Sequence, residues 1–359
     1  MTINTTRLSV ALTLALLAAP GCALDPGVAA ILATALEDGP ASPRPTGTVN
    51  TQVTGTGTGV VPNLPVIGTG TGAVLGSVTG GMRDPAPGSN GEQVLDVVNQ
   101  ARALAGIPPV TLDPSLSNAC AKHAHYMVLN AGTPAITEAL NAHKEQEGLP
   151  GYTAEGAKAG AAADLSWGQA PVPAVLGLIA TLYHRTPILN SNVVKIGYAF
   201  EKDTVGGDAS VLMFEYGGSG ARKVAAFPAD GQTDVPLAFD GGERPNPVPD
   251  DAGITGYPVT LALPGGAKAT NVKGQLFDDT GAEVPIYYSD DDHPASYFQQ
   301  GNVVCMFAKK PMKQGTTYRA SVSADLDGKP TAWNWKFTTI TPKEVDADDV
   351  AAVKSFFGK

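Results

Sequence analysis

Apolar residues recur with helical spacing in two segments that follow residue 90. In the first, apolar residues from Val94 to Leu104 keep the i, i+3, i+4, i+7 order of an amphipathic helix. The second begins where Asp113 can act as N-cap and Pro114 can take the first helical position. His123 shares the apolar face of this second helix, so a satisfied core histidine is its better interpretation, whereas His125 points the other way.

Further along, the pattern changes from helix to strand. A helical segment at residues 172–183 is followed by two β-prone apolar runs at 193–200 and 209–216, separated by a turn-like Gly-rich stretch. Helices first and strands last, within residues 91–220, predict one unit with a mixed α+β layer fold.

Between residues 227 and 339 the chain alternates apolar and polar residues with period two. The alternating runs centre on Leu261, Ile286, Cys305, Ala320 and Trp335, and the last two are joined by a turn containing Asp327-Gly328. Short strands without a helical run predict a two-sheet β-sandwich over residues 221–341. Trp333 and Trp335 can be read as a sugar-stacking platform, but core residues are the better interpretation.

The N-terminal segment has the order of a signal peptide. A polar head with one Arg precedes an apolar run from Leu8 to Ala19, which is shorter than the ~20 residues of a spanning helix. The small residues before Cys22 resemble the lipobox of bacterial lipoproteins, although Ala19 stands where that family usually has Leu. The resemblance implies a signal peptide over residues 1–21 and a lipid anchor on Cys22 that holds the protein to a membrane of the bacterial cell envelope; the alternative is cleavage and release as a secreted protein.

Composition limits the remaining possibilities. Residues 22–90 are rich in Gly, Thr and Pro, which predicts a disordered tether, and residues 342–359 form a C-terminal tail with the pattern of a short helix. The formal charge is −10 without a basic block, so nucleic acid is not an expected partner. Besides Cys22 only Cys120 and Cys305 remain; we expect buried thiols, with a single bridge between them as the alternative.

The first unit resembles the bacterial CAP (SCP-like) domains over residues 92 to 218. The residues that carry the resemblance are 98–102, 106–110, Leu112-Asp113, Leu116-Ser117, Ala121, His123-Ala124, Met127, Tyr183-His184-Arg185, 187–189 and Ile196-Gly197. Their order and spacing within one unit make the match more specific than any single motif. The resemblance implies an α-β-α sandwich with a central cleft in which two His and one or two acidic residues gather, sometimes around a divalent metal.

Carried over by position, the resemblance places His143, His184 and Glu155 in this cleft. Two imidazoles and one carboxylate are a familiar ligand set for Zn²⁺ or another divalent metal. The second acidic position has no match, and Ala157 replaces the Asn of the family pattern. Two other interpretations stay open: Glu145 and Glu147 in the same polar loop can simply pair with His143, and His184 can hydrogen-bond a helix end.

The second unit resembles bacterial Ig-like domains at its opening, residues 227–236, and at its close, residues 335–339. The acidic loop Asp290-Asp291-Asp292-His293 lacks EF-hand spacing and is best interpreted as a solvated turn. No nucleophile motif or phosphate loop accompanies the predicted cleft, so a catalytic role is not favoured. The CAP resemblance alone leaves hydrolase activity open as an alternative.

Two functional classes remain. In the first, a lipid-anchored, surface-exposed CAP protein binds a divalent metal or a small ligand in its His/Glu cleft, with lipid, peptide or envelope polymer as candidate partners. In the second, a structural or adhesive envelope protein carries a degenerate cleft and contacts its partners through the Ig-like domain.

Overall fold

The computed structural model describes residues 82–341 except 139, 204–206, 218–222, 265 and 297–299. The predicted signal peptide, Cys22, nearly all of the tether and the C-terminal tail lie outside the described residues. Across the part of the chain that is described, no helix combines the length and the apolar character needed to cross a membrane.

The first two helices begin where the sequence predicts. Helix α3 (Asn90–Leu104) starts with a capping box in which Ser89 and Glu92 exchange hydrogen bonds. Helix α4 (Pro114–Leu129) is capped by Asp113, whose Oδ1 accepts from the backbone N–H of Ser115 at 2.8 Å. Both apolar faces are buried, which confirms the helical spacing.

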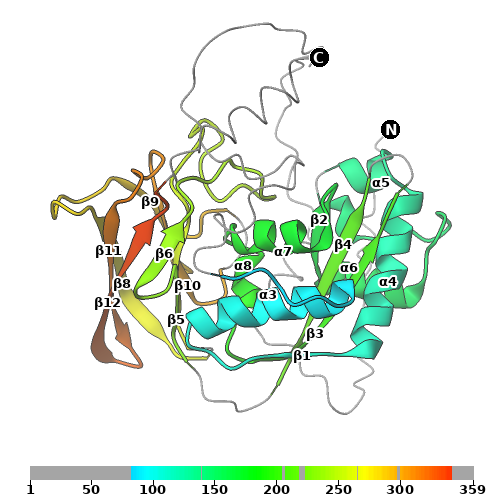
Figure 1. The fold of residues 1–359 in the computed structure, drawn as a ribbon, viewed down its shortest axis with the longest axis horizontal. Coiled ribbons are helices and arrows are strands. Elements are labelled where there is room, and N and C mark those ends of the chain that lie inside the picture. The colour runs from blue at the N-terminus through cyan, green and yellow to red at the C-terminus, as the bar shows by residue number, and fades with distance from the viewer. Residues whose placement is uncertain are drawn as a thin grey trace, which may run out of the picture.

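The first half is a three-layer arrangement around a four-stranded sheet with the order β1-β3-β4-β2 (Figure 1). Helix α4 contacts β3 and β4 and α6 contacts β4, whereas α3 contacts β1 and β3 and α7 contacts β2. Strand β1 pairs in parallel with β3, and the other pairs are antiparallel. The remaining elements are β1 (Thr111–Leu112), α5 (Pro134–Thr137), η1 (Asn141–His143), α6 (Ala154–Ala162), β2 (Asp164–Trp167), α7 (Pro171–Ile179), α8 (Arg185–Ile188), β3 (Val193–Glu201) and β4 (Ala209–Tyr216).

The second half is built from two four-stranded sheets. The first sheet has the order β5 (Ala225–Phe227), β7 (Val259–Ala262), β10 (Val303–Ala308), β9 (Ile286–Ser289). The second has the order β6 (Gln232–Val235), β12 (Lys329–Thr339), β11 (Thr317–Leu326), β8 (Ala269–Phe277). The predicted alternating runs are all strands, and the described residues add β5, β6 and β8 to them.

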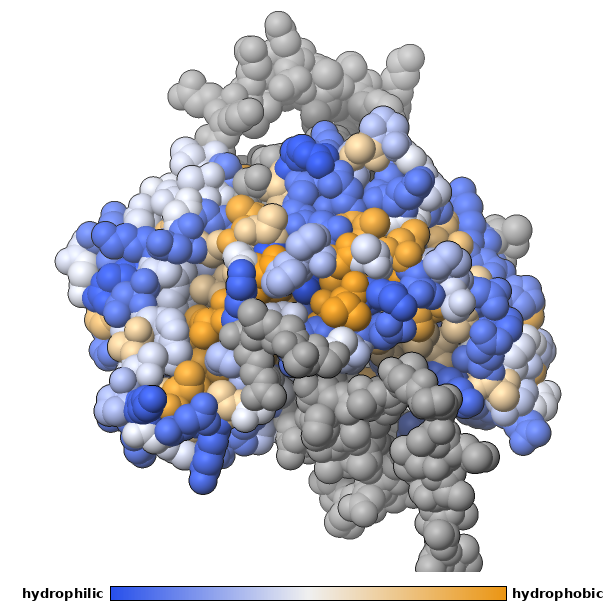
Figure 2. All heavy atoms as spheres, turned by 90° about the horizontal axis from the view of Figure 1, so that it is seen from below, coloured by the Kyte–Doolittle hydropathy of each residue, from blue (hydrophilic) through white to orange (hydrophobic). Residues whose placement is uncertain are grey.

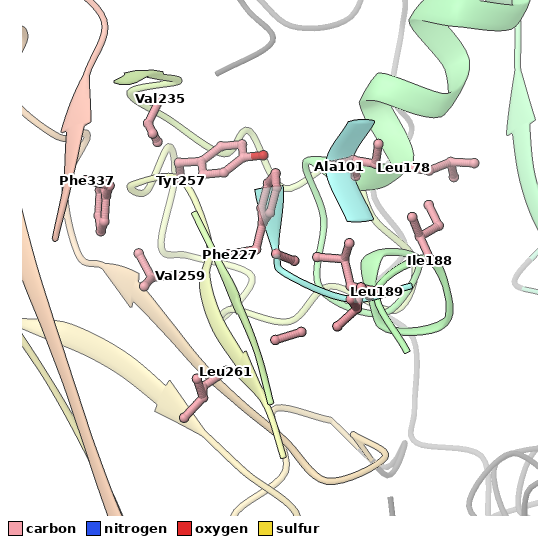
Figure 3. Close-up of a cluster of buried hydrophobic side chains, with 14 of the residues drawn as sticks. Ala101, Leu178, Ile188, Leu189, Phe227, Val235, Tyr257, Val259, Leu261 and Phe337 are labelled. Carbon is pink, nitrogen blue, oxygen red and sulfur yellow. The ribbon is translucent and has the colours of Figure 1, made fainter. Parts of the chain in front are cut away.

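One hydrophobic core runs through both halves. It contains residues of α3 and α7 together with residues of both sheets of the second half. Figure 3 shows Phe227 and Tyr257 between Ala101 and Leu189 of the first half and Phe337 of β12. Seen from below, hydrophobic side chains gather near the middle of the molecule and hydrophilic ones dominate its two sides (Figure 2). The two units are therefore packed together as successive layers.

The burial of strand β10 shows that the two halves pack against each other. All six of its residues are buried, although alternate side chains of a strand point to opposite faces. Val304 and Met306 belong to the main core, whereas Val303, Cys305 and Phe307 pack with Leu182 of the first half. The outer face of this antiparallel sheet is covered by Leu182, which lies between α7 and α8, and by Phe239 and Val248 from the segment between β6 and β7.

The predictions for cysteine and tryptophan are confirmed. Cys120 and Cys305 are both buried free thiols, so the alternative of a bridge between them is wrong. Burial raises the pKa of the Cys120 thiol to about 12, which leaves it unreactive. Trp335 is buried in the core and Trp333 packs against it, as expected for core residues.

Candidate functional site

His184 is paired with an acid from the second half of the chain. Its Nδ1 lies 2.9 Å from Oε1 of Glu243, whose side chain is fully buried. The same carboxylate accepts the backbone N–H groups of Leu182 at 2.9 Å and Tyr183 at 2.7 Å. Glu243 lies in the segment between β6 and β7, and nothing in the sequence linked it to His184.

Arg185, the next residue, is bound to the second half as well. Its Nη1 donates to the carbonyl of Pro258 at 2.6 Å, and its Nε donates to the carbonyl of Ile179 at the same distance. The guanidinium lies 4.9 Å from the ring centroids of both Phe227 and Tyr257. The His184-Arg185 dipeptide therefore joins the two halves of the molecule.

His143 is held by helix α6. Its Nδ1 lies 2.9 Å from the carbonyl oxygen of Gly160. Since a carbonyl only accepts, Nδ1 carries the proton and Nε2 is the ring nitrogen left over. The pKa of His143 is lowered to about 4, chiefly by burial and to a smaller extent by the charges of His184 and His123, while the hydrogen bond to the Gly160 carbonyl opposes the shift. His143 is therefore a neutral imidazole within electrostatic reach of His184.

Asp164 supplies a carboxylate at the start of β2. It is only 8% exposed, and its Oδ2 has no hydrogen-bond partner among the described residues. Burial raises its pKa to about 8; the charge of His184 opposes this and that of Glu243 adds to it. A buried carboxylate oxygen without a partner requires an explanation such as a bound ion or water.

The pKa of His184 reflects these two acids. Burial is the largest single influence and lowers it, but the hydrogen bond that His184 donates to Glu243 and the charges of Asp164 and Glu243 together outweigh burial. The pKa is raised to about 9. His184, Asp164 and Glu243 consequently form one electrostatically coupled group, to which His143 is linked through His184.

Glu155 lies apart from this group. It is in the first turn of α6, its side chain is 49% exposed, and it forms an ion pair with Lys122. The family-based position for the acid thus falls on the outer surface of a helix, where an acid favours the helix N-terminus and a surface lysine. The buried carboxylate within electrostatic reach of His184 is Asp164, at the first residue of the following strand.

Both ring nitrogens of His123 have hydrogen-bond partners within the fold. Nδ1 lies 3.0 Å from Oε1 of Glu145 and Nε2 lies 2.9 Å from the carbonyl of Ala142, and both side chains of the pair are fully buried. Burial lowers the pKa of His123. The interpretation as a satisfied core histidine is confirmed, and Glu145 pairs with His123 instead of His143. His125 is exposed and bonds to Glu201.

The donor atoms fit a divalent cation in chemical type. His143 and His184 each have Nδ1 held by an oxygen atom, the arrangement that orients metal-binding imidazoles through their other nitrogen. Asp164 adds a carboxylate oxygen without a partner. Over the described residues, however, no three His, Cys, Asp or Glu side chains already converge closely enough to hold an ion.

Comparison with known proteins identifies the first unit. Residues 95–216 match the profile of the family described as "CAP: Cysteine-rich secretory protein family". These residues form a CAP domain, which confirms the resemblance seen in the sequence.

Two solved structures are similar to parts of the chain. CopC from Methylosinus trichosporium OB3b matches at 16% identity and a TM-score of 0.22, over 33% of this chain and 92% of that one. An extracellular protein containing a SCP domain from Bacillus anthracis str. Ames matches at 16% identity and a TM-score of 0.24, over 34% of this chain and 40% of that one. A search of curated proteins found no match.

Proposed function

We propose that this protein is an exported CAP-domain protein whose cleft binds a divalent metal ion through His143, His184 and Asp164. The observation that carries the proposal is the buried Oδ2 of Asp164, which lacks a partner among the described residues and lies within electrostatic reach of His184. The Nδ1 atoms of His184 and His143 are already held by oxygen atoms. Zn²⁺ prefers two or three imidazole nitrogens with a carboxylate oxygen. The location outside the cytoplasm, with a lipid anchor at Cys22 and an Ig-like second domain, stays part of the proposal from the sequence.

The protein's own residues determine what the site can do. Gly160 and Glu243 each hold one of the two imidazoles, and Asp164 is buried. When bound, the metal would supply a positive charge that can hold an anionic or carbonyl-containing ligand. Without a nucleophile motif, binding is a better supported role than turnover.

Zinc binding tests the proposal. The purified full chain, freed of metal with EDTA, should take up one Zn²⁺ per chain at neutral pH in isothermal titration calorimetry, confirmed by elemental analysis. His143→Ala and His184→Ala should each weaken binding by roughly 100-fold, and Asp164→Asn by roughly 10-fold, because each removes a ligand.

Glu155→Gln is the matched control. It changes a carboxylate of the same domain that pairs with a surface lysine, so zinc affinity should stay within about twofold. Absence of stoichiometric zinc would remove the metal proposal. Loss of affinity in Glu155→Gln with retention in Asp164→Asn would assign the acid to the residue that the sequence first suggested.

A second candidate is a structural or adhesive envelope protein with a degenerate cleft. The contacts of Arg185 favour it, because the segment next to His184 serves to join the two halves. In this case binding to bacterial cells or envelope polymer should be unchanged in the His143→Ala, His184→Ala double variant. If the double variant loses that binding, the candidate is wrong.

A further inference from the structure

We infer that Glu243, contributed by the second half of the chain, is a positioning residue for His184, so that packing of this half and occupancy of the CAP cleft depend on each other. The inference rests on the proposed function of the cleft and adds a residue that lies outside the CAP domain. It also gives the second half a role in the site itself.

The geometry of Glu243 leaves it little freedom. Its Oε1 accepts from the backbone N–H of Tyr183 and His184 and lies against the His184 ring, while its Oε2 accepts from the backbone N–H of Leu182. The side chain is fully buried. A charged group that accepts several hydrogen bonds in a buried site is held in one orientation, since any other would leave it unpaired.

The contact between Glu243 and the His184 ring shows that Glu243 does more than accept hydrogen bonds from backbone N–H groups. Three backbone N–H groups would be satisfied by a carboxylate whichever way the imidazole turned. Here Oε1 also takes the Nδ1–H of His184, so the ring is fixed and Nε2 is the nitrogen available to the cleft. The hydroxyl of Thr181, 3.2 Å from the same nitrogen, is the other polar neighbour.

The loop that contains Glu243 is also held in place by contacts with other residues of the second half. Phe239 and Thr255 exchange backbone hydrogen bonds of 2.9 and 3.0 Å, closing the loop that contains Glu243. The Phe239 ring lies 5.1 Å from that of Phe307 in β10. Phe239, Phe307 and Leu182 then share one buried cluster. Movement of β10 relative to the CAP domain would therefore displace Glu243.

Two coupled equilibria follow from this arrangement. A ligand that binds the cleft only when His184 is held in place also favours the packed state of the second half, and the packed state favours the ligand by the same factor. Loss of the carboxylate should weaken both.

The test compares Glu243→Gln with Glu145→Gln. Both substitutions replace the carboxylate of a buried His–Glu pair by an amide of the same shape, but only Glu243 faces a histidine of the cleft. We expect Glu243→Gln to lower zinc affinity roughly 10- to 100-fold and to shift the side-chain ¹⁵N resonances of His184. Glu145→Gln should shift those of His123 and leave zinc affinity within about twofold.

Unchanged His184 resonances in a folded Glu243→Gln variant would overturn the inference, as would an equal loss of zinc affinity in the two variants. If Glu243→Gln does not fold, the unsubstituted protein provides the measurement. Its His184 Nδ1–H should give a slowly exchanging proton resonance, and a rapidly exchanging one would contradict the assignment.

The experiment also distinguishes a failure of the proposed metal site from a failure of the inference about Glu243. If the unsubstituted protein takes up no zinc, the metal site falls. The ring resonances of His184 in the metal-free variants then still decide whether Glu243 positions that ring.

Discussion

Two histidines of the CAP domain form buried His–Glu pairs that look alike but differ in which ring nitrogens they leave without a hydrogen bond. In His123–Glu145 the partners are 22 positions apart, and the second ring nitrogen is bound to Ala142. In His184–Glu243 they are 59 positions apart, and among the described residues only Nδ1 of the ring has a hydrogen-bond partner. The first pair is complete in itself. In the second pair Nε2 of His184 is left over, and the residue lies within electrostatic reach of Asp164, whose Oδ2 has no partner among the described residues.

The difference teaches that burial alone does not mark a functional histidine. Both histidines touch a carboxylate with no exposed surface, yet burial lowers the pKa of His123 whereas two neighbouring acids raise that of His184. What separates them is the number of ring atoms whose hydrogen bonds are already made. A histidine with both nitrogens satisfied inside the fold has nothing left to offer a ligand.

Removal of the first pair should have the largest effect on stability. His123→Ala leaves Glu145 buried without its partner and opens a cavity against α6, so we expect a loss of about 3 to 5 kcal/mol in the free energy of unfolding. Urea denaturation measures it. His125→Ala, two residues and about half a helical turn away on the exposed face, should change stability by less than about 0.5 kcal/mol. A His123→Ala variant as stable as its control would mean that this pair is not structural.

Gly160 contacts both His123, which is satisfied within the fold, and His143 of the candidate site, so its substitution tests both. A Cβ at this position would overlap the ring of His123, while the Gly160 carbonyl holds His143. We expect Gly160→Ala to destabilise the protein by about 1 to 3 kcal/mol through overpacking and to weaken zinc binding.

Gly177→Ala is the matched control for this substitution, since in helix α7 its Cβ would meet only Gln169, at 3.5 Å. It should raise stability by about 0.5 to 1 kcal/mol, because alanine favours the helix. Equal effects of the two substitutions in urea denaturation would contradict a tight fit between α6 and His123.

The first pair has no neighbouring acid that corresponds to Asp164. Substitution of Asp164 should give the smallest change in stability, and this change should be an increase. Its pKa is raised to about 8, so the stability that its protonated form contributes is complete below about pH 4 and is lost as pH rises toward 8. In metal-free protein, Asp164→Asn should therefore raise the free energy of unfolding by about 1 kcal/mol at pH 8, and by less at pH 5. A gain that is the same at both pH values would contradict the raised pKa.

Local chemistry made the first elements predictable. The capping residues of α3 and α4 and the period-two runs of β7, β10, β11 and β12 each act over a few neighbouring positions, and a sequence records such preferences directly. Strand β8 was missed because Lys273 and Gly274 interrupt its apolar alternation, and only pairing with β11 makes it a strand.

The candidate site was predictable only in part. His143 and His184 were identified through a family pattern. Asp164 gave a weak signal, as the acid that opens the short β-prone run ending at Trp167. Glu243 gave none, because its role depends on how two distant segments pack and its Gly-rich surroundings are typical of an ordinary turn.

The shared core also affects how the chain can reach its final state as it is made. Synthesis from the N-terminus completes the CAP segment first, when β10 and the carbonyl of Pro258 are not yet available to Leu182 and Arg185. During that interval an apolar face and a guanidinium that end up buried are open to other chains. The newborn CAP segment should therefore need protection from aggregation until the last strands have been added.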